Sequence, residues 1–164
     1  MRPGFRALPF PDGGGGGEEE AGCYRYEHPG CGRPCETCPR LNVSRTFTSK
    51  YTRRTYKMRH RLTCKSTFIV CLWQGCPSQY TGSSIRSMMA RHAGHRQEVR
   101  ERSSNLGIHF SDCGFENFSL QIIDCVREGE VEALGRLKGF WQHNLATFVE
   151  NGGINRRDEM TRQR

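Results

Sequence analysis

Residues 66–73 read STFIVCLW, and the apolar stretch in this run constrains the fold more than any other feature of the chain. A short, continuous apolar run is typical of a strand that is buried on both faces. The turn-like sequence QGCPS follows it, and QYTGS at 79–83 then reads as a second strand. Because only a few residues separate the two strands, we predict that they pair antiparallel.

Helical and extended patterns alternate after this pair, which predicts an α/β domain. Ser83 or Ser84 can cap a helix that buries Ile85, Met88, Met89 and His92. Residues 117–126 read as a third strand, and apolar residues recur at helical spacing from Leu134 to Phe148, before the stop sequence NGGIN. We therefore expect a small three-stranded mixed or antiparallel sheet flanked by helices.

The chain divides into four segments by composition. Residues 1–22 hold a Gly run and an acidic run and predict a disordered tail. Residues 23–64 form a Cys-rich, zinc-knuckle-like segment and a basic linker or hairpin, residues 65–156 form the α/β domain, and residues 157–164 form a charged tail.

Charge and hydrophobicity narrow the class of protein. A net charge of +8 over 164 residues favours an anionic partner, most often nucleic acid. No apolar run is long enough to span a membrane, and the first 20 residues lack the apolar core of a signal peptide. We expect an intracellular protein, nuclear if it binds DNA, with reduced cysteines; the oligomeric state stays open.

Three cysteines, Cys31, Cys35 and Cys38, follow a C-x3-C-x2-C spacing that lets several thiolates converge on one ion. Structural zinc takes four such ligands, so we predict a zinc site. We favour Cys64 as the fourth ligand, with Cys23, His28 and His60 as alternatives. Unpaired thiols in a flexible segment are the competing interpretation. Buried free thiols are expected at three further positions, Cys71, Cys113 and Cys125, while Cys76 is undecided.

A family resemblance rests on the motif order. The sequence YTG at 80–82, a following helix with Arg91 and His95, HF at 109–110, Trp141 and Asn155 together resemble the GIY-YIG nuclease domain. The upstream sequences GCGRPCETCPR, FTSK and YKMRHRLTCKSTFIV resemble the segment that precedes such domains in Penelope-like and related retroelement reverse transcriptases. The resemblance covers about residues 28–156.

The resemblance implies a site that hydrolyses a phosphodiester with one Mg²⁺ or Mn²⁺ ion. Tyr80 would orient or activate the attacking water, Arg91 would hold the scissile phosphate, and His95 would assist proton transfer or hold the phosphate. His109 and Asn155 would support the site. Arg91 and His95 are four residues apart and share a helix face. By spacing alone, the competing interpretation is a surface Arg91 paired with Glu98 and a neutral surface imidazole.

Two departures from the family pattern predict impaired catalysis. Val70 or Cys71 occupies the place of the Tyr in the first motif, and Lys138 stands where the metal-binding Glu is expected. A lysine cannot ligate Mg²⁺, although it can bind phosphate. Glu132 is about 120° away from Lys138 around the helix and is a poor replacement. We assign nucleic-acid contacts to Arg86, Arg96 and Lys138.

Three functions compete. The first is a degenerate GIY-YIG domain, derived from a retroelement, that binds DNA without cutting it. The second is an active metal-dependent DNA-nicking endonuclease. The third is a zinc-stapled interaction module with no nucleic-acid role.

Overall fold

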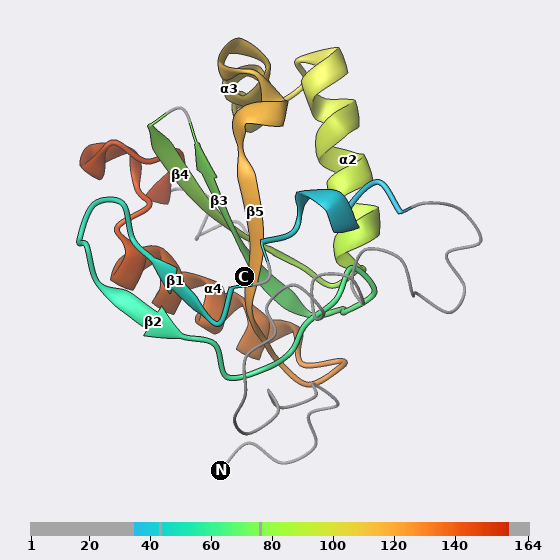
Figure 1. Ribbon diagram of the computed structural model, residues 1–164, viewed down its shortest axis with the longest axis vertical. Coiled ribbons are helices and arrows are strands. Elements are labelled where there is room, and N and C mark those ends of the chain that lie inside the picture. Colours follow the sequence, from blue (N-terminus) through green and yellow to red (C-terminus); the bar gives the residue numbers. More distant parts are fainter. Residues whose placement is uncertain (1–34, 43, 76, 158–164) are drawn as a thin grey trace.

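The computed structural model describes residues 35–42, 44–75 and 77–157. Three α-helices and five β-strands occur in these residues (Figure 1). The strands are β1 (Thr46–Thr48), β2 (Thr55–Lys57), β3 (Ile69–Gly75), β4 (Ser78–Ser84) and β5 (Ser119–Cys125). The α-helices are α2 (Met88–Glu101), α3 (Asn105–Cys113) and α4 (Val131–Leu145), with short 3-10 turns at Cys38–Arg40, Phe115–Asn117 and Val149–Asn151.

The central sheet has the order β4-β3-β5, and both pairings are antiparallel. The predicted pair of strands is confirmed, with Trp73 opposite Tyr80. Every residue of β3 except Gln74 is buried, as its apolar sequence predicted. The third predicted strand is confirmed as β5. The chain is therefore a small α/β protein with a three-stranded and a two-stranded antiparallel sheet.

The two faces of β3 enter different hydrophobic clusters. Ile69, Cys71 and Trp73 share a cluster with residues of α2 and α3, whereas Val70 and Leu72 pack with residues of α4. Helices thus cover both faces of the sheet, which explains why β3 carries no polar alternation (Figure 1). No described helix is long and apolar enough to cross a membrane.

Residues 44–61 contain a hairpin whose strands β1 and β2 pair from Thr46–Lys57 to Thr48–Thr55. Its inward side chains, Phe47 and Tyr56, stack with ring centroids 5.5 Å apart, and each meets Trp141 of α4 edge-on. Figure 1 shows the hairpin beside α4. Of the two possibilities that the sequence left open, a hairpin or a linker, the hairpin is found.

The start of α2 differs from the prediction. The N-cap is Ser87, whose side chain accepts a hydrogen bond from the Ala90 N–H, instead of Ser83 or Ser84. Because β4 pairs with β3 as far as Ser84, the helix cannot begin there. The later start changes the buried face: Ile85 and Met89 are 53% and 38% exposed, and the buried residues are Met88, His92 and His95.

Two further corrections concern the second half of the chain. The last helix ends at Leu145, where Ala146 takes a left-handed conformation (φ 54°), so Phe148 and the NGGIN sequence lie beyond it. Helix α3 had not been predicted; Ser104 caps it and Phe110 anchors it in the core. Cys113, expected as a free thiol, is disulfide-bonded, while Cys71 and Cys125 are buried free thiols as predicted.

Candidate functional site

Three cysteines form a compact centre. The sulfur atoms of Cys35, Cys38 and Cys64 all lie within 4.8 Å of one another, and all three side chains are buried. We call these residues the cysteine centre. Its spacing suits one metal ion, because the thiolates of a tetrahedral site are similarly close. Cys31, Cys23 and His28, the other candidate ligands, lie outside the described residues. His60 instead lies near Asp124 and Cys125.

Hydrogen bonds around Cys35 favour the thiolate form of this residue, which is the form that binds a metal ion. Burial raises the pKa of the Cys35 thiol, but hydrogen bonds from the backbone of Cys38 and Thr37 and from the thiols of Cys38 and Cys64 together outweigh it, so this pKa is lowered. By contrast, burial and the neighbouring thiols of Cys38 and Cys35 raise the pKa of Cys64. Without a cation the centre therefore cannot hold three thiolates, whereas a divalent ion would favour all three.

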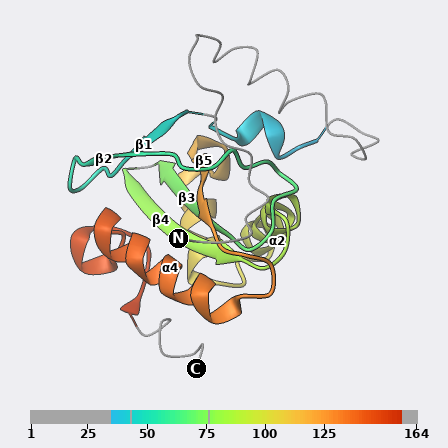
Figure 2. The same cartoon turned by 90° about the horizontal axis from the view of Figure 1, so that it is seen from below.

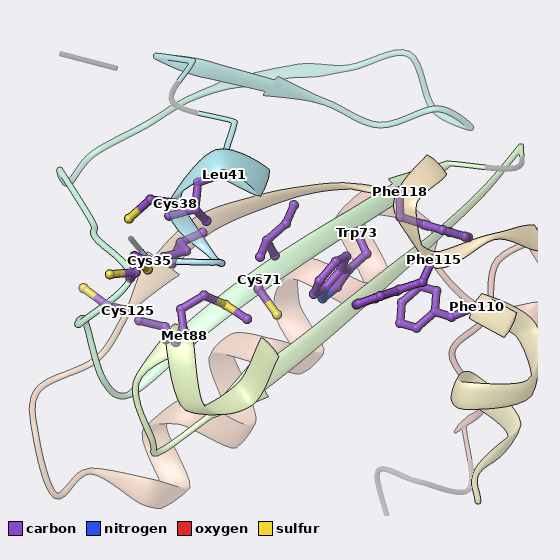
Figure 3. Close-up of a cluster of buried hydrophobic side chains, with 14 residues drawn as sticks. Cys35, Cys38, Leu41, Cys71, Trp73, Met88, Phe110, Phe115, Phe118 and Cys125 are labelled. Atoms are coloured by element: carbon purple, nitrogen blue, oxygen red, sulfur yellow. The ribbon is translucent and has the colours of Figure 1, made fainter. Parts of the chain in front are cut away.

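The cysteine centre lies at one end of the core, under the start of α2. Figure 3 shows the sulfur atoms of Cys35, Cys38 and Cys125 at one end of the cluster, with the Trp73 and Phe110 rings towards the other. The backbone carbonyl of Cys64 accepts a hydrogen bond of 2.9 Å from the Met89 N–H in the first turn of α2. The centre therefore fastens the segment that precedes β3 to the helix that carries Arg91.

The segment around Cys35 and Cys38 is also tied to α2 by side chains. Thr37 Oγ1 lies 2.8 Å from His92 Nδ1, and Glu36 pairs with Arg96. Arg96, predicted to contact nucleic acid, is thus an ion-pair partner of the cysteine-rich segment.

A basic groove runs past the end of β4, between α2 and α4, and has a volume of about 1250 Å³. Four cations line it, Arg86, Arg91, Arg136 and Lys138, with Glu132 as its single acidic residue. The groove therefore suits an anion. Arg136 had not been singled out from the sequence. Gly135 and Gly139, which reduce helix propensity, also line the groove. Their four-residue spacing places them on one helix face and could have indicated a face without bulky side chains.

His95 lies next to Tyr80 and, through Glu98, close to Arg91. His95 is fully buried, and its ring meets the rings of Tyr80 and Trp73 edge-on, with centroids 6.4 and 5.5 Å away. Glu98 lies between the two basic residues: its carboxylate is 3.4 Å from His95 Nδ1 and 3.7 Å from Arg91 Nη1. The pairing of Arg91 with Glu98 that the sequence offered as the alternative is therefore present.

Packing fixes the position of Tyr80 and of Glu98. Tyr80 and Gly82 share one face of β4, and a Cβ at Gly82 would come within 2.7 Å of the Tyr80 ring. A Cβ at Gly107 would come within 2.5 Å of the Glu98 carbonyl oxygen, so glycine there lets α3 approach α2. Glycine at these two positions therefore leaves room for the Tyr80 ring and for the close approach of α3 to α2.

The Nε atom of Arg91 is buried and has no hydrogen-bond partner among the described residues. Its guanidinium also influences Cys71, because burial raises the pKa of this thiol and the charge of Arg91 counteracts the rise. Cys71 faces the same side of the sheet as Tyr80, and Val70 faces α4. An unsatisfied buried donor beside a groove is a natural place for an anion.

Of the five predicted catalytic residues, Arg91 lines the groove, while Tyr80, His95, His109 and Asn155 do not. Asn155 is buried, and its side chain accepts a hydrogen bond from the Thr81 N–H (2.8 Å) and donates one to the Thr81 carbonyl (2.9 Å). His109 lies on α3, with Nε2 3.7 Å from Cys113 Sγ. Asn155 thus positions β4 next to Tyr80, while His109 belongs to the α3 side of the core.

The buried histidines predict a loss of stability in acid. Burial, together with the charges of Arg96 and Arg40, lowers the pKa of His92 to about 4, and burial lowers the pKa of His95. The unfolded histidines bind protons below about pH 6.5, so stability falls as the pH drops from there towards 4. For His92 alone the loss reaches about 3 kcal/mol.

Urea unfolding at pH 7, 5 and 4 measures this loss. His92→Gln, which cannot titrate, should flatten the pH dependence, while mutation of the exposed His143 to Gln should leave it unchanged. Equal pH slopes in wild type and His92→Gln would contradict the assignment.

Comparison with known proteins assigns no family. No family model, no curated protein and no solved structure matches this chain.

Proposed function

We propose that this chain is a divergent GIY-YIG-type domain, of retroelement origin, that binds DNA and is impaired as an endonuclease. The observation that carries the proposal is the basic groove, which gathers Arg86, Arg91 and Lys138 from separate helices and loops around one cavity. Arg91 and His95 both lie next to Glu98, and the His95 ring meets that of Tyr80. The resemblance implies that these three residues form a phosphate site. The order of strand pair, helix and late helix also agrees with the family expectation.

Phosphate binding follows from the groove itself. The guanidinium of Arg91 is planar and rigid and can donate two hydrogen bonds to one phosphate. Lys138 adds a point charge from α4, and Arg86 adds one from the loop before α2. Such contacts should make DNA affinity fall steeply with salt concentration.

The groove does not fit a catalytic Mg²⁺ ion. Such an ion needs oxygen ligands, and the groove offers one carboxylate, that of Glu132, whose side chain is 94% exposed. Lys138 would repel the ion from the same wall. His95 is fully buried and does not line the groove, and burial lowers the pKa of its imidazole, so it would be a weak base shielded from a phosphate held there. We therefore propose a site that grips phosphate without efficient cleavage.

The cysteine centre fits zinc. Three buried thiols within 4.8 Å of one another match three corners of a tetrahedral site. In our proposal zinc has a structural role, because the thiols lie in the core and away from the groove lining. Bound zinc would hold residues 35–42 and Cys64 against α2.

The test is nicking of supercoiled plasmid with Mg²⁺ or Mn²⁺, beside a gel-shift assay. Wild type should shift DNA and leave the plasmid supercoiled. Lys138→Glu should raise Mg²⁺-dependent nicking above background, because it adds an oxygen ligand and removes the repelling charge. Adding Arg91→Ala to this variant should lower the rate about 100-fold, the usual cost of one transition-state donor.

The other outcomes favour the competing functions. Nicking by wild type that Arg91→Ala abolishes would establish the active endonuclease. A folded wild type that neither shifts nor nicks DNA would favour the zinc-stapled interaction module. Background nicking by folded Lys138→Glu would mean that Val70, Cys71 or another lesion limits catalysis.

A further inference from the structure

A second cluster of Lys and Arg residues lies outside the groove. Residues 37–97 contain 12 Lys and Arg residues and no Asp or Glu. Seven of these cations fall within residues 44–61, which contain the β1–β2 hairpin and the residues that flank it. We call residues 44–61 the basic hairpin. None of its residues lines the groove between α2 and α4.

The basic hairpin has an apolar inner face that is fastened to the core. Phe47 is 3% exposed, and Ser49 Oγ donates a hydrogen bond of 2.6 Å to the Leu145 carbonyl at the end of α4. Gln121 of β5 donates to the carbonyls of Ser44 and Thr46, both at 3.1 Å. The hairpin is thus a fixed part of the fold, and Figure 2 shows its loop end at the periphery.

Its outer face carries cations and hydroxyls. Arg53, Arg54, Lys57 and Arg59 are all exposed, and within the described part of the chain none of them pairs with a carboxylate. Thr48 and Thr55 are exposed on the two strands, with their hydroxyl oxygens 2.8 Å apart. Cations interleaved with hydroxyl donors suit the phosphate oxygens of a nucleic-acid backbone.

We propose that the basic hairpin is a second nucleic-acid contact that binds the phosphodiester backbone outside the groove. The hairpin packs against the C-terminal half of α4, through Trp141 and Leu145, whereas the groove follows the helix from Val131 to Gln142. A nucleic acid held in the groove can therefore be held at a second place along the same helix. This inference rests on the proposed DNA-binding function and extends it.

An anionic membrane is the other polyanionic partner, and the surface favours nucleic acid over it. Peripheral membrane elements combine cations with exposed apolar side chains that enter the interface. Among the described residues the exposed large apolar side chains are Ile85, Met89, Val131, Phe140 and Val149, and all of them lie outside the hairpin. The hairpin offers charge and hydroxyls alone.

The test compares three triple variants of the whole chain by fluorescence anisotropy with a labelled 25-base-pair duplex over a range of salt. The hairpin variant carries Arg54→Gln, Lys57→Gln and Arg59→Gln. The control carries Arg100→Gln, Arg127→Gln and Arg156→Gln, which removes the same charge from exposed positions outside the hairpin and the groove. The groove variant carries Arg86→Gln, Arg136→Gln and Lys138→Gln.

The hairpin variant should bind at least about tenfold more weakly, with a salt slope less steep by about one unit per lost phosphate contact. The control should change affinity less than about threefold, since it alters only the overall charge. Equal losses in the hairpin variant and the control would overturn the inference. So would a hairpin variant that keeps its DNA affinity and instead loses binding to phosphatidylserine vesicles.

The groove variant separates this inference from the proposed function. If it binds like wild type while the hairpin variant does not, the groove proposal fails and the hairpin contact stands. If it alone loses affinity, the groove proposal stands and the hairpin inference fails. Circular dichroism spectra like that of wild type ensure that each variant is folded.

Discussion

Replacing Cys64 with Ser should abolish metal binding at the cysteine centre and destabilise the fold by about 4 kcal/mol or more, the scale of effect seen when a structural metal is lost. Cys64 is fully buried, and its backbone carbonyl contacts the first turn of α2. Losing the ion would release residues 35–42 and loosen the helix that carries Arg91. Zinc content of the purified protein and its thermal unfolding midpoint measure the two effects.

Cys71→Ser is the matched control. Cys71 is also a fully buried free thiol, but it lies outside the group that can hold a metal. We expect this variant to keep its zinc and to lose only about 1–3 kcal/mol of stability, because the Gly82 carbonyl, 3.6 Å from Cys71 Sγ, is a distant acceptor for a buried hydroxyl. A wild type that contains no zinc and unfolds at the same temperature as Cys64→Ser would show that the centre is only a group of buried thiols.

Asn155→Ala should lower the free energy of unfolding by about 3 kcal/mol while leaving DNA affinity within about twofold of wild type. The side chain bonds both backbone groups of buried Thr81. Without it the N–H would lose its partner, at a cost of about 1–3 kcal/mol, and the carbonyl would keep only the 3.4 Å hydrogen bond from Gln142 Nε2. Asn155 does not line the groove, so its effect on binding should be indirect. Urea unfolding and anisotropy with duplex DNA measure the two quantities.

The control here is Asn144→Ala. Asn144 donates a hydrogen bond to the Phe140 carbonyl on the exposed side of α4, and its loss should change stability by no more than about 0.5 kcal/mol. If Asn155→Ala were as stable as wild type, or lost more than tenfold in DNA affinity while folded, Asn155 would have a direct role in binding instead of a positioning role.

Local patterns in the sequence were enough to predict the β3–β4 pair and helix α4, because these elements depend on the spacing of apolar residues. The apolar run of β3 and its polar partner β4 predicted an antiparallel pair, because a buried strand needs apolar side chains on both faces. The stripe from Leu134 to Leu145 predicted α4 for the same reason. Short Cys spacing brought Cys35 and Cys38 together, and Cys64 was correctly placed beside them.

Other features depended on contacts between distant segments. His92 and His95 are polar residues on the buried face of α2, and they are accepted there because Phe110, Phe115 and Trp73 surround them. That aromatic cluster is built from α3, the turn after it and β3. From the α2 sequence alone, Ile85 and Met89 were the expected buried residues and the helix was expected to begin at Ser83 or Ser84. In the structure it begins at Met88, and both of these side chains are exposed.

The sequence by itself determined the charge of this protein, its three-stranded sheet and the grouping of Cys64 with Cys35 and Cys38. Tertiary structure alone decided which charged side chains are neighbours. Arg86 and Arg91 line one groove with Lys138, while Arg96 forms an ion pair with Glu36. The reason is physical. The sequence positions of charged side chains follow no repeat that identifies which charges will be neighbours. Their neighbours depend on how the apolar faces of α2 and α4 pack on opposite sides of one sheet.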